Sequence, residues 1–451
     1  MQEINAGIFK AYDIRGIYPS EINEDLIYKI GQAYVKVVQP NGKIAVGHDV
    51  RLSSEKLSES LIKSLTDAGI DVVDVGLIST EMLYYAVGNF GYQGGLQVTA
   101  SHNPAEYNGL KMVREEAKPI SSDTGIYEMR DLIIAGKEKV DSDTKGSVEK
   151  KDIMVDFAQF VLKYVDISAI KPLKLVYNPN FGLEGEVLKK VIEAGNLPLE
   201  IVGLNNTPDG NFPKGRPDPF RPENRPEFVE LVKSSNADLG VAWDADADRV
   251  FFCTKSGNFL EPYYLNALLI KLQLEKKPGS TIVYDPRFTW AIIDSAKENG
   301  GNAVVSRVGH SFIKEKMREV DGIFCGESSG HTYFKDFWYA DSGIIPLLLV
   351  LELVSKKGDL DALLKPYFDK YFMPGEINTE VNDAQAKIKE IKEKYADGKQ
   401  DELDGISIEY PDWRFNVRSS NTEPLLRLCL EAKSKELMEE KKDEVLGIIR
   451  G

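Results

Sequence analysis

The fold class can be predicted from the stretch KIAVGHDVRLSSEKLSESLIKSLTDAGIDVVDV, residues 43–75. The short apolar run Lys43–Gly47 predicts a strand. The run Glu55–Ala68 predicts an amphipathic helix, because its leucines recur at helical spacing. Gly69 is placed to end that helix, and Ile70–Val75 predicts the next strand. Strand, helix, glycine and strand form the unit from which parallel α/β sheets are built.

The same order returns twice along the chain. The second copy comprises Leu173–Tyr177, Leu183–Ala194, Gly195 and Leu199–Leu204, and the third comprises Thr281–Tyr284, a helix through Asn299, Gly300–Gly301 and Ala303–Val308. A unit repeated at this scale indicates tandem domains. We therefore predict an α/β protein with three similar tandem α/β domains that have mixed sheets.

The chain after about Lys365 has a different pattern. It predicts a charged helix over Ala384–Tyr395 and antiparallel strands at Ile406–Tyr410, Arg414–Val417 and Leu425–Leu430, the first two joined by a turn at Pro411–Asp412. That is a smaller C-terminal α+β domain. We expect domains at 1–150, 151–255, 256–366 and 367–451, with linkers near Asp141–Lys151, Thr254–Asn258 and Lys365–Gly375.

Composition excludes several classes of protein. The 451 residues are 42% hydrophobic and 28% charged, as in globular proteins. Lys and Arg number 56 against 71 Asp and Glu, a net charge of −15, which disfavours a broad nucleic-acid face. Three cysteines without C-x-x-C spacing exclude a disulfide framework. No run reaches the ~18 apolar residues that span a membrane, the longest being Ile344–Leu351, and the N-terminus lacks a signal pattern. We expect a soluble cytoplasmic protein.

The loop Thr99–Pro104, which reads TASHNP, follows the apolar strand Gly95–Val98. Ser101 is flanked there by a small residue and by His102. A hydroxyl that takes part in group transfer needs open space and a nearby acid–base group, and this loop offers both. An ordinary polar turn is the alternative.

A second loop, DADADR at residues 244–249, follows the strand Leu239–Ala242. Aspartates at alternate positions offer hard oxygen ligands to Mg²⁺ or Ca²⁺. An EF-hand would need glycine and glutamate where Arg249 and Lys255 stand, so that interpretation fails. Carboxylates this close repel one another without a cation, which favours a metal site over a solvated acidic loop.

Two further loops are suited to sugar and phosphate. The segment CGESSGH, residues 325–331, sets Glu327 and Ser329 among glycines, which suits recognition of sugar hydroxyls. The segment RSSNTEP, residues 418–424, with Arg427 just beyond it, combines arginines, hydroxyls and turn N–H groups, the groups that bind a phosphate monoester. Plain polar turns are the alternatives, and His331 alone is more simply structural.

Together these loops resemble the α-D-phosphohexomutase superfamily. The resemblance spans the chain from AYDIRG at residues 11–16 to Arg427, and the four loops stand in the family's order, one in each expected domain. It implies three similar α/β domains and a smaller fourth around a central cleft. The segments AYDIRG, VTASHNP and NTEP are most like the bacterial phosphomannomutase/phosphoglucomutase branch. Alanines replace frequent glycines at Ala100, Ala245 and Ala247.

The resemblance carries over residue by residue. Ser101 matches the serine that holds the transferable phosphate. Together with Asp244, Asp246 and Asp248, it also matches the ligands of one Mg²⁺. Residues matching the groups around the phosphoserine are His102, Arg15, Lys111 and Arg249. Residues matching substrate contacts are Tyr12, Arg287, His310, Glu327, Ser329, Arg418, Ser420, Asn421, Thr422 and Arg427, with Arg287 near a position where close relatives carry lysine.

The implied activity is reversible phosphate transfer between O1 and O6 of a hexose phosphate. Phosphoserine 101 would form a glucose or mannose 1,6-bisphosphate, which serves as intermediate and activator. Glu327 and Ser329 can hold O3 and O4, which do not distinguish glucose from mannose. Phosphoglucosamine mutase is the alternative within the family. A Mg²⁺-dependent sugar phosphatase and an inactive sugar-phosphate binding protein are alternatives from other classes. We expect hexose phosphates as ligands, no nucleic acid or membrane, and a monomer or weak homodimer.

Overall fold

The computed structural model describes residues 4–419 and 425–451. Contacts along the chain divide it into two compact units. The first unit comprises Met1–Phe259 and Gly330–Leu360, and the second comprises Leu260–Ser329 and Asp361–Gly451. Each unit is described by itself.

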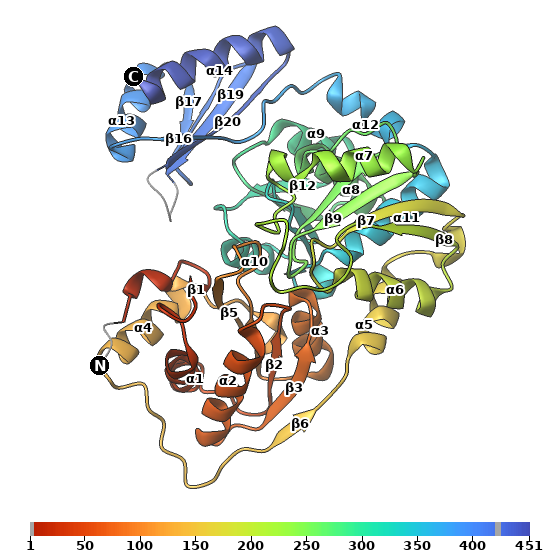
Figure 1. Ribbon diagram of the computed structural model, residues 1–451. Helices are drawn as coiled ribbons and strands as arrows, with labels where there is room; N and C mark the ends of the chain where they lie inside the picture. The colour runs from red at the N-terminus through yellow and green to blue at the C-terminus, as the bar shows by residue number, and fades with distance from the viewer. Residues whose placement is uncertain (1–3, 420–424) are drawn as a thin grey trace. The chain divides into compact units, whose positions relative to one another are not determined.

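A mixed sheet forms the N-terminal part of the first unit (Figure 1). In spatial order its strands are β1 (Ile14–Ile17), β5 (Tyr107–Arg114), β4 (Gly94–Val98), β2 (Ile44–His48), β3 (Val72–Leu77) and β6 (Val148–Lys150). The helices of this part are α1 (Glu24–Val38), α2 (Ser54–Asp67), α3 (Thr80–Phe90) and α4 (Ile126–Ile134). Strands β2, β3 and β4 pair in parallel, whereas β5 is antiparallel to β4 and β1.

The first unit holds a second mixed sheet. Its strands, in spatial order, are β10 (Val250–Thr254), β9 (Leu239–Trp243), β7 (Leu173–Asn178) and β8 (Leu199–Gly203), with helices α5 (Met154–Val161), α6 (Glu184–Gly195) and α7 (Pro226–Ser234). Strand β7 is parallel to β8 and β9, and β10 is antiparallel to β9. The hairpin β14 (Thr332–Phe334) and β15 (Ala340–Asp341) and helix α11 (Ile344–Lys357) complete the unit.

Helix α11 contains the longest apolar run of the sequence. Its residues from Ile344 to Ser355 are all buried, so that run serves packing inside the unit. No helix within residues 4–419 and 425–451 combines the length and the apolar character that crossing a membrane requires.

The second unit holds a parallel sheet and an antiparallel sheet. Strands β12 (Asn302–Val305), β11 (Thr281–Tyr284) and β13 (Phe324–Gly326) pair in parallel, with helices α8 (Pro262–Lys276), α9 (Trp290–Glu298), α10 (His310–Glu319) and α12 (Leu360–Phe368). The C-terminal sheet is antiparallel in the order β16 (Ile377–Glu380), β20 (Leu425–Ala432), β19 (Trp413–Ser419), β18 (Ile406–Glu409) and β17 (Lys399–Asp401). Helices α13 (Ala384–Lys394) and α14 (Lys435–Arg450) pack on it (Figure 1).

The predicted fold class is confirmed, with local corrections. The expected linker at 141–151 contains β6, which pairs in parallel with β3, and Lys365 lies inside α12 rather than in a linker. Helix α6 ends at Gly195 and is capped by Asn196, whose φ of 45° is left-handed. Asparagine tolerates this conformation, so it replaces glycine as the cap.

Candidate active site

Ser101 stands in the turn after β4 with a strained backbone. Its φ is 49°, in the left-handed region, which costs a non-glycine residue roughly 1–2 kcal/mol. Its N–H donates to Thr99 Oγ1 at 3.0 Å, and its hydroxyl donates to Asp244 Oδ2 at 2.8 Å. The hydroxyl oxygen also lies 3.1 Å from His102 Nδ1. The surroundings therefore fix one rotamer and bring the hydroxyl to the aspartate loop.

Arg51 holds this turn in place, and the sequence analysis missed it. Its guanidinium is buried and pairs with Asp49 at 3.2 Å. It donates to backbone carbonyl oxygens of the turn, those of Ser101, Asn103, Pro104 and Tyr107, at 2.6, 2.8, 2.6 and 3.0 Å. The only sequence signal is that Asp49 and Arg51 directly follow β2, at the edge where loops carry chemistry in α/β sheets.

The aspartate loop follows β9 and is buried. Asp244 and Asp246 are 0% exposed and Asp248 is 2% exposed, and oxygens of the three lie within 4.8 Å of one another. Within residues 4–419 and 425–451, Oδ1 of Asp246 has no hydrogen-bond partner. An orphaned buried carboxylate oxygen beside two more carboxylates fits a hard divalent cation. These residues therefore suit a metal ion.

Two basic residues offset part of this charge. Lys111, on β5, lies 2.7 Å from Asp246 Oδ2 and also donates to Asp248. Arg249 Nε lies 3.7 Å from Asp244 Oδ2. Burial together with the charges of Asp248 and Asp246 raises the pKa of Asp244 to about 8. Burial also acts to raise the pKa of Asp248, but Lys111 and His331 outweigh it and hold that pKa well below its usual range.

His102 and Arg15 lie beside the serine. Burial, with Arg249 and Arg15 nearby, holds the pKa of His102 well below its usual range, so its ring is neutral at pH 7. Arg15, on β1, donates to the Ala100 carbonyl oxygen at 3.3 Å and to Asn103 Oδ1 at 2.7 Å. The structure thus brings together all the residues that the sequence analysis placed around Ser101.

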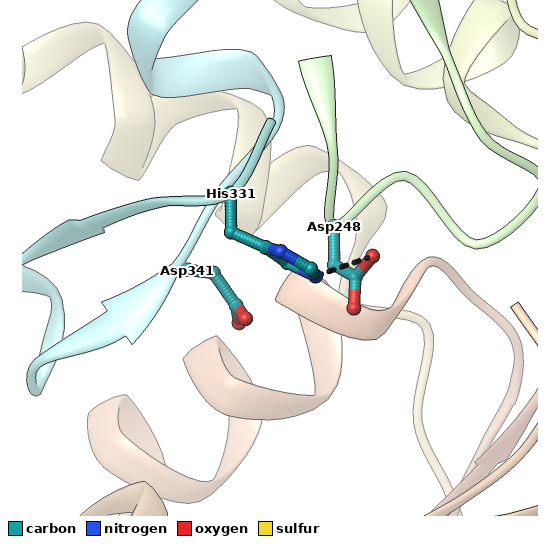
Figure 2. A group of neighbouring side chains, drawn as sticks. All are labelled: Asp248, His331 and Asp341. Carbon is teal, nitrogen blue, oxygen red and sulfur yellow. Dashed lines mark ion pairs between the residues drawn. The ribbon is translucent and has the colours of Figure 1, made fainter. Parts of the chain in front are cut away.

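His331 also belongs to this cluster. It precedes β14, and its Nε2 lies 3.4 Å from Asp248 Oδ1 (Figure 2). Asp341, on β15, completes a buried group of three possible ligand atoms within 4.8 Å. The sequence analysis favoured a structural role for His331 taken alone, and nothing local connects residue 331 with residue 248. Only the fold brings them together.

The second unit holds the residues expected to contact substrate. Arg287 is buried and donates to both oxygens of Asp285 at 2.9 Å and to Glu327 Oε1 at 2.9 Å. The Ser328 N–H donates to Asp285 Oδ2 at 3.0 Å. Ser329 follows in the same loop, and His310 begins α10. Tyr12, by contrast, lies in the first unit, just before β1.

A cluster of arginines surrounds one carboxylate, Glu376. Arg418 lies 2.9 Å from it, Arg427 3.3 Å and Arg287 3.9 Å. Burial acts to raise the pKa of Glu376, but these arginines lower it below its usual value. Arg418 is 8% exposed, and its Nε has no hydrogen-bond partner among the described residues. Ser420, Asn421 and Thr422 of the predicted phosphate loop lie outside the described residues.

Comparison with known proteins agrees with this geometry. Models of phosphoglucomutase/phosphomannomutase alpha/beta/alpha domains I, II and III match residues 6–137, 155–257 and 261–371, and that of the C-terminal domain matches 376–448. A phosphomannomutase of Escherichia coli is 44% identical over 451 residues, covering 98% of this chain and 99% of its own. A Xanthomonas campestris protein named phosphohexose mutases is 45% identical over 447 residues, with 98% and 99% covered.

A solved structure agrees over the same length. The crystal structure of a phosphoglucomutase/phosphomannomutase family protein from Burkholderia thailandensis superimposes with a TM-score of 0.89 at 32% identity, covering 99% of this chain and 98% of that one. Fold and site together define a phosphohexomutase, an isomerase that transfers phosphate. The chain belongs to the phosphoglucomutase/phosphomannomutase family.

Arg51→Lys is expected to lower kcat by about 100-fold, since displacing a reacting group by about 1 Å costs that much. Lysine keeps the charge beside Asp49, but its single ammonium cannot reach all the carbonyls that the guanidinium holds. The measurement is turnover of hexose 1-phosphate. Arg130→Lys, at a half-buried arginine beside Asp131, is the matched control. A folded Arg51→Lys variant with wild-type turnover would contradict the positioning role.

Proposed function

We propose that this protein interconverts the 1-phosphate and 6-phosphate of glucose and mannose through phosphoserine 101 and a hexose 1,6-bisphosphate. The observation that carries the proposal is the Ser101 hydroxyl, which donates to Asp244 among buried carboxylates and lies beside a neutral histidine. A phosphate on that oxygen would lie next to Lys111, Arg15 and Arg249, whose charges suit a phosphoryl group in transfer.

Asp244, Asp246 and Asp248, with an oxygen of the phosphorylated Ser101, would hold one Mg²⁺. When bound, the ion would offset the negative charge of the transferring phosphoryl group. The chain's own residues orient the reacting groups and balance the remaining charge. Arg51 and Arg15 orient the turn, Lys111 and Arg249 balance charge, and His102 Nδ1 lies beside the Ser101 hydroxyl.

The second unit would bind the part of the substrate that is not reacting. Glu327 and Ser329 would accept and donate hydrogen bonds at O3 and O4 of the sugar. Arg418 supports a phosphate site through its buried Nε–H, which has no partner among the described residues and can donate to an anion. We propose that Arg427, His310, Arg287 and Tyr12, with Ser420, Asn421 and Thr422, complete the contacts.

We further propose that the protein works in the cytoplasm as a monomer or weak homodimer, without nucleic acid or membrane. Its net charge of −15 and its three buried cysteines support this setting.

The direct test follows both the enzyme and its products. Protein treated with glucose 1,6-bisphosphate should gain the mass of one phosphoryl group. Glucose 1-phosphate, mannose 1-phosphate and glucosamine 1-phosphate are then assayed side by side for 6-phosphate. Conversion of glucosamine phosphate alone would favour phosphoglucosamine mutase. Release of inorganic phosphate in place of the isomer would favour a phosphatase. Binding of the hexose phosphates without turnover would favour an inactive sugar-phosphate binding protein.

Arg418→Ala is expected to raise KM for hexose 1-phosphate and hexose 6-phosphate alike, by about 10–100-fold, because a charge-assisted contact contributes roughly 1.5–3 kcal/mol. Either phosphate must occupy the Arg418 site while the other reacts at Ser101. The variant should also release more bisphosphate, because the intermediate loses an anchor as it reorients.

In this variant, phosphorylation of Ser101 by added bisphosphate should be less impaired than turnover of the monophosphates. Arg414→Ala is unsuitable as a control, because that arginine is buried against Glu431 at 3.0 Å, so exposed Arg450→Ala is the better comparison. An effect on only one monophosphate would exclude a shared anchor and with it the two-orientation mechanism.

A further inference from the structure

A buried ion pair, Arg414 with Glu431, joins the C-terminal sheet to the turn between β11 and α9 within the second unit. The two residues are direct cross-strand partners on β19 and β20, and Nη1 of the arginine lies 3.0 Å from Oε1 of the glutamate. Glu431 is 0% exposed and Arg414 is 4% exposed. Because taking two charges out of water is costly, such a pair needs further hydrogen bonds.

Glu431 finds those hydrogen bonds at the start of α9. Its Oε1 accepts from the Thr289 N–H at 2.7 Å, from the Thr289 hydroxyl at 3.1 Å and from the Trp290 N–H at 3.3 Å. The Tyr263 hydroxyl, on α8, donates to Oε2. Thr289, the residue before α9, makes no side-chain cap of its own. The carboxylate of β20 therefore supplies the acceptor and the negative charge that the start of a helix favours.

Arg414 holds the turn that leads into α9. Its Nη1 donates to the Arg287 carbonyl oxygen at 3.0 Å, and its Nη2 donates to the Pro286 carbonyl oxygen at 2.9 Å. One planar guanidinium thus binds two successive carbonyl groups and a carboxylate. The backbone of Arg287 is fixed in this way by the C-terminal sheet, while its side chain donates to Glu327.

The same two strands carry the arginines of the proposed phosphate site. Arg418 lies four residues beyond Arg414 on β19, and since side chains alternate along a strand, both lie on one face of the sheet. Arg418 is the cross-strand partner of Arg427, as Arg414 is of Glu431. At about 3.4 Å per residue, roughly 14 Å of strand separates the two pairs. One continuous ladder therefore holds the Arg287 turn at one place and the phosphate arginines at another.

We propose that Arg414 is a positioning residue, which sets the distance between the sugar contacts around Arg287 and the phosphate site around Arg418. Glu431 keeps Arg414 in place. The inference rests on the substrate contacts of the proposed function. A hexose phosphate fills both sites at once, so its affinity depends on the distance between them. Inorganic phosphate fills only the phosphate site, so its affinity does not depend on that distance.

The test is Arg414→Lys in the full chain, with glucose 6-phosphate and inorganic phosphate as probes in metal-free buffer, where no turnover is expected. Lysine keeps the charge beside Glu431, but its ammonium cannot reproduce the planar fork that binds both carbonyls. The dissociation constant of glucose 6-phosphate should rise about tenfold, as when one charge-assisted contact loses its alignment. That of inorganic phosphate at Arg418 should stay within about twofold of wild type, as for sites this far apart. Arg450→Lys, at an exposed arginine of the same unit, is the matched control.

The two probes separate positioning from a general weakening of the sheet. Phosphate bound at Arg418 is the part that Arg418→Ala abolishes, which distinguishes it from phosphate bound near Ser101. Equal loss of affinity for both probes in Arg414→Lys would indicate a merely structural role and would overturn the inference. Glucose 6-phosphate affinity equal to wild type would overturn it too, as would a wild type that binds no phosphate at Arg418.

If Arg414→Lys does not fold, Arg414→Met combined with Glu431→Gln takes its place, since removing both charges of a buried pair is tolerated better than removing one. Methionine cannot hold the two carbonyls, so the same difference between the probes is expected. Wild type that binds both probes but does not isomerise glucose 6-phosphate when Mg²⁺ and bisphosphate are added would refute the proposed function. The inference would still be decided by the two dissociation constants.

Discussion

Ser101→Ala is expected to lower turnover by at least about 1,000-fold, a rise of roughly 4 kcal/mol in the barrier. The hydroxyl oxygen is the atom that would carry the transferable phosphate, and alanine has no oxygen in that place. The measurement is hexose phosphate isomerisation together with intact mass after treatment with bisphosphate. The variant should show neither conversion nor the gain of one phosphoryl group.

The fold should survive this change. Ser101 lies in a loop, and alanine adopts its left-handed backbone at a cost similar to that of serine. Ser122→Ala, at a hydroxyl that donates to Asp123 in an exposed turn of the same unit, is the matched control and should keep full turnover. Turnover of Ser101→Ala within about tenfold of wild type would rule out a phosphoserine mechanism.

Much of the fold follows from local pattern. Sequence alone predicts the strand at 44–48, the amphipathic helix from Ser54 and the positive φ of Gly69. Each of these features is set by residues within one turn of each other. The same holds for the loops bearing Ser101 and Asp244. Each directly follows a buried strand, and composition marks each as polar.

The residues that the sequence analysis missed depend on tertiary contact. Arg51 donates hydrogen bonds to a turn some fifty positions further along the chain. His331 contacts Asp248 only because β14 lies in the same unit as the aspartate loop.

The structure also gives a physical meaning to one substitution. Ala247, one of the positions where the resemblance implies a frequent glycine, has a φ of 59°. A left-handed residue in the aspartate loop would account for such a preference for glycine. Alanine accepts the same conformation at a cost of roughly 1–2 kcal/mol, so the loop geometry is retained.

Removal of divalent metal is expected to abolish turnover, and added Mg²⁺ should restore it. Asp244, Asp246 and Asp248 are buried together, and when all three ionise to hold a metal, Lys111 and Arg249 leave a net negative charge even before a phosphate arrives. Phosphorylation of Ser101 would add a further negative charge of about 1.5–2. Ionised carboxylates and a phosphate can coexist in that volume only with a further cation.

The measurement is turnover after chelation, followed by titration with Mg²⁺. Asp246→Asn should need about 10–100-fold more Mg²⁺ for half-maximal turnover, because the amide keeps the shape but removes the charge of the carboxylate whose Oδ1 is orphaned. Asp143→Asn, at an exposed aspartate of the same unit, should behave as wild type. Full turnover in metal-free buffer would mean that Lys111 and Arg249 suffice to neutralise the site, and the three aspartates would then be structural.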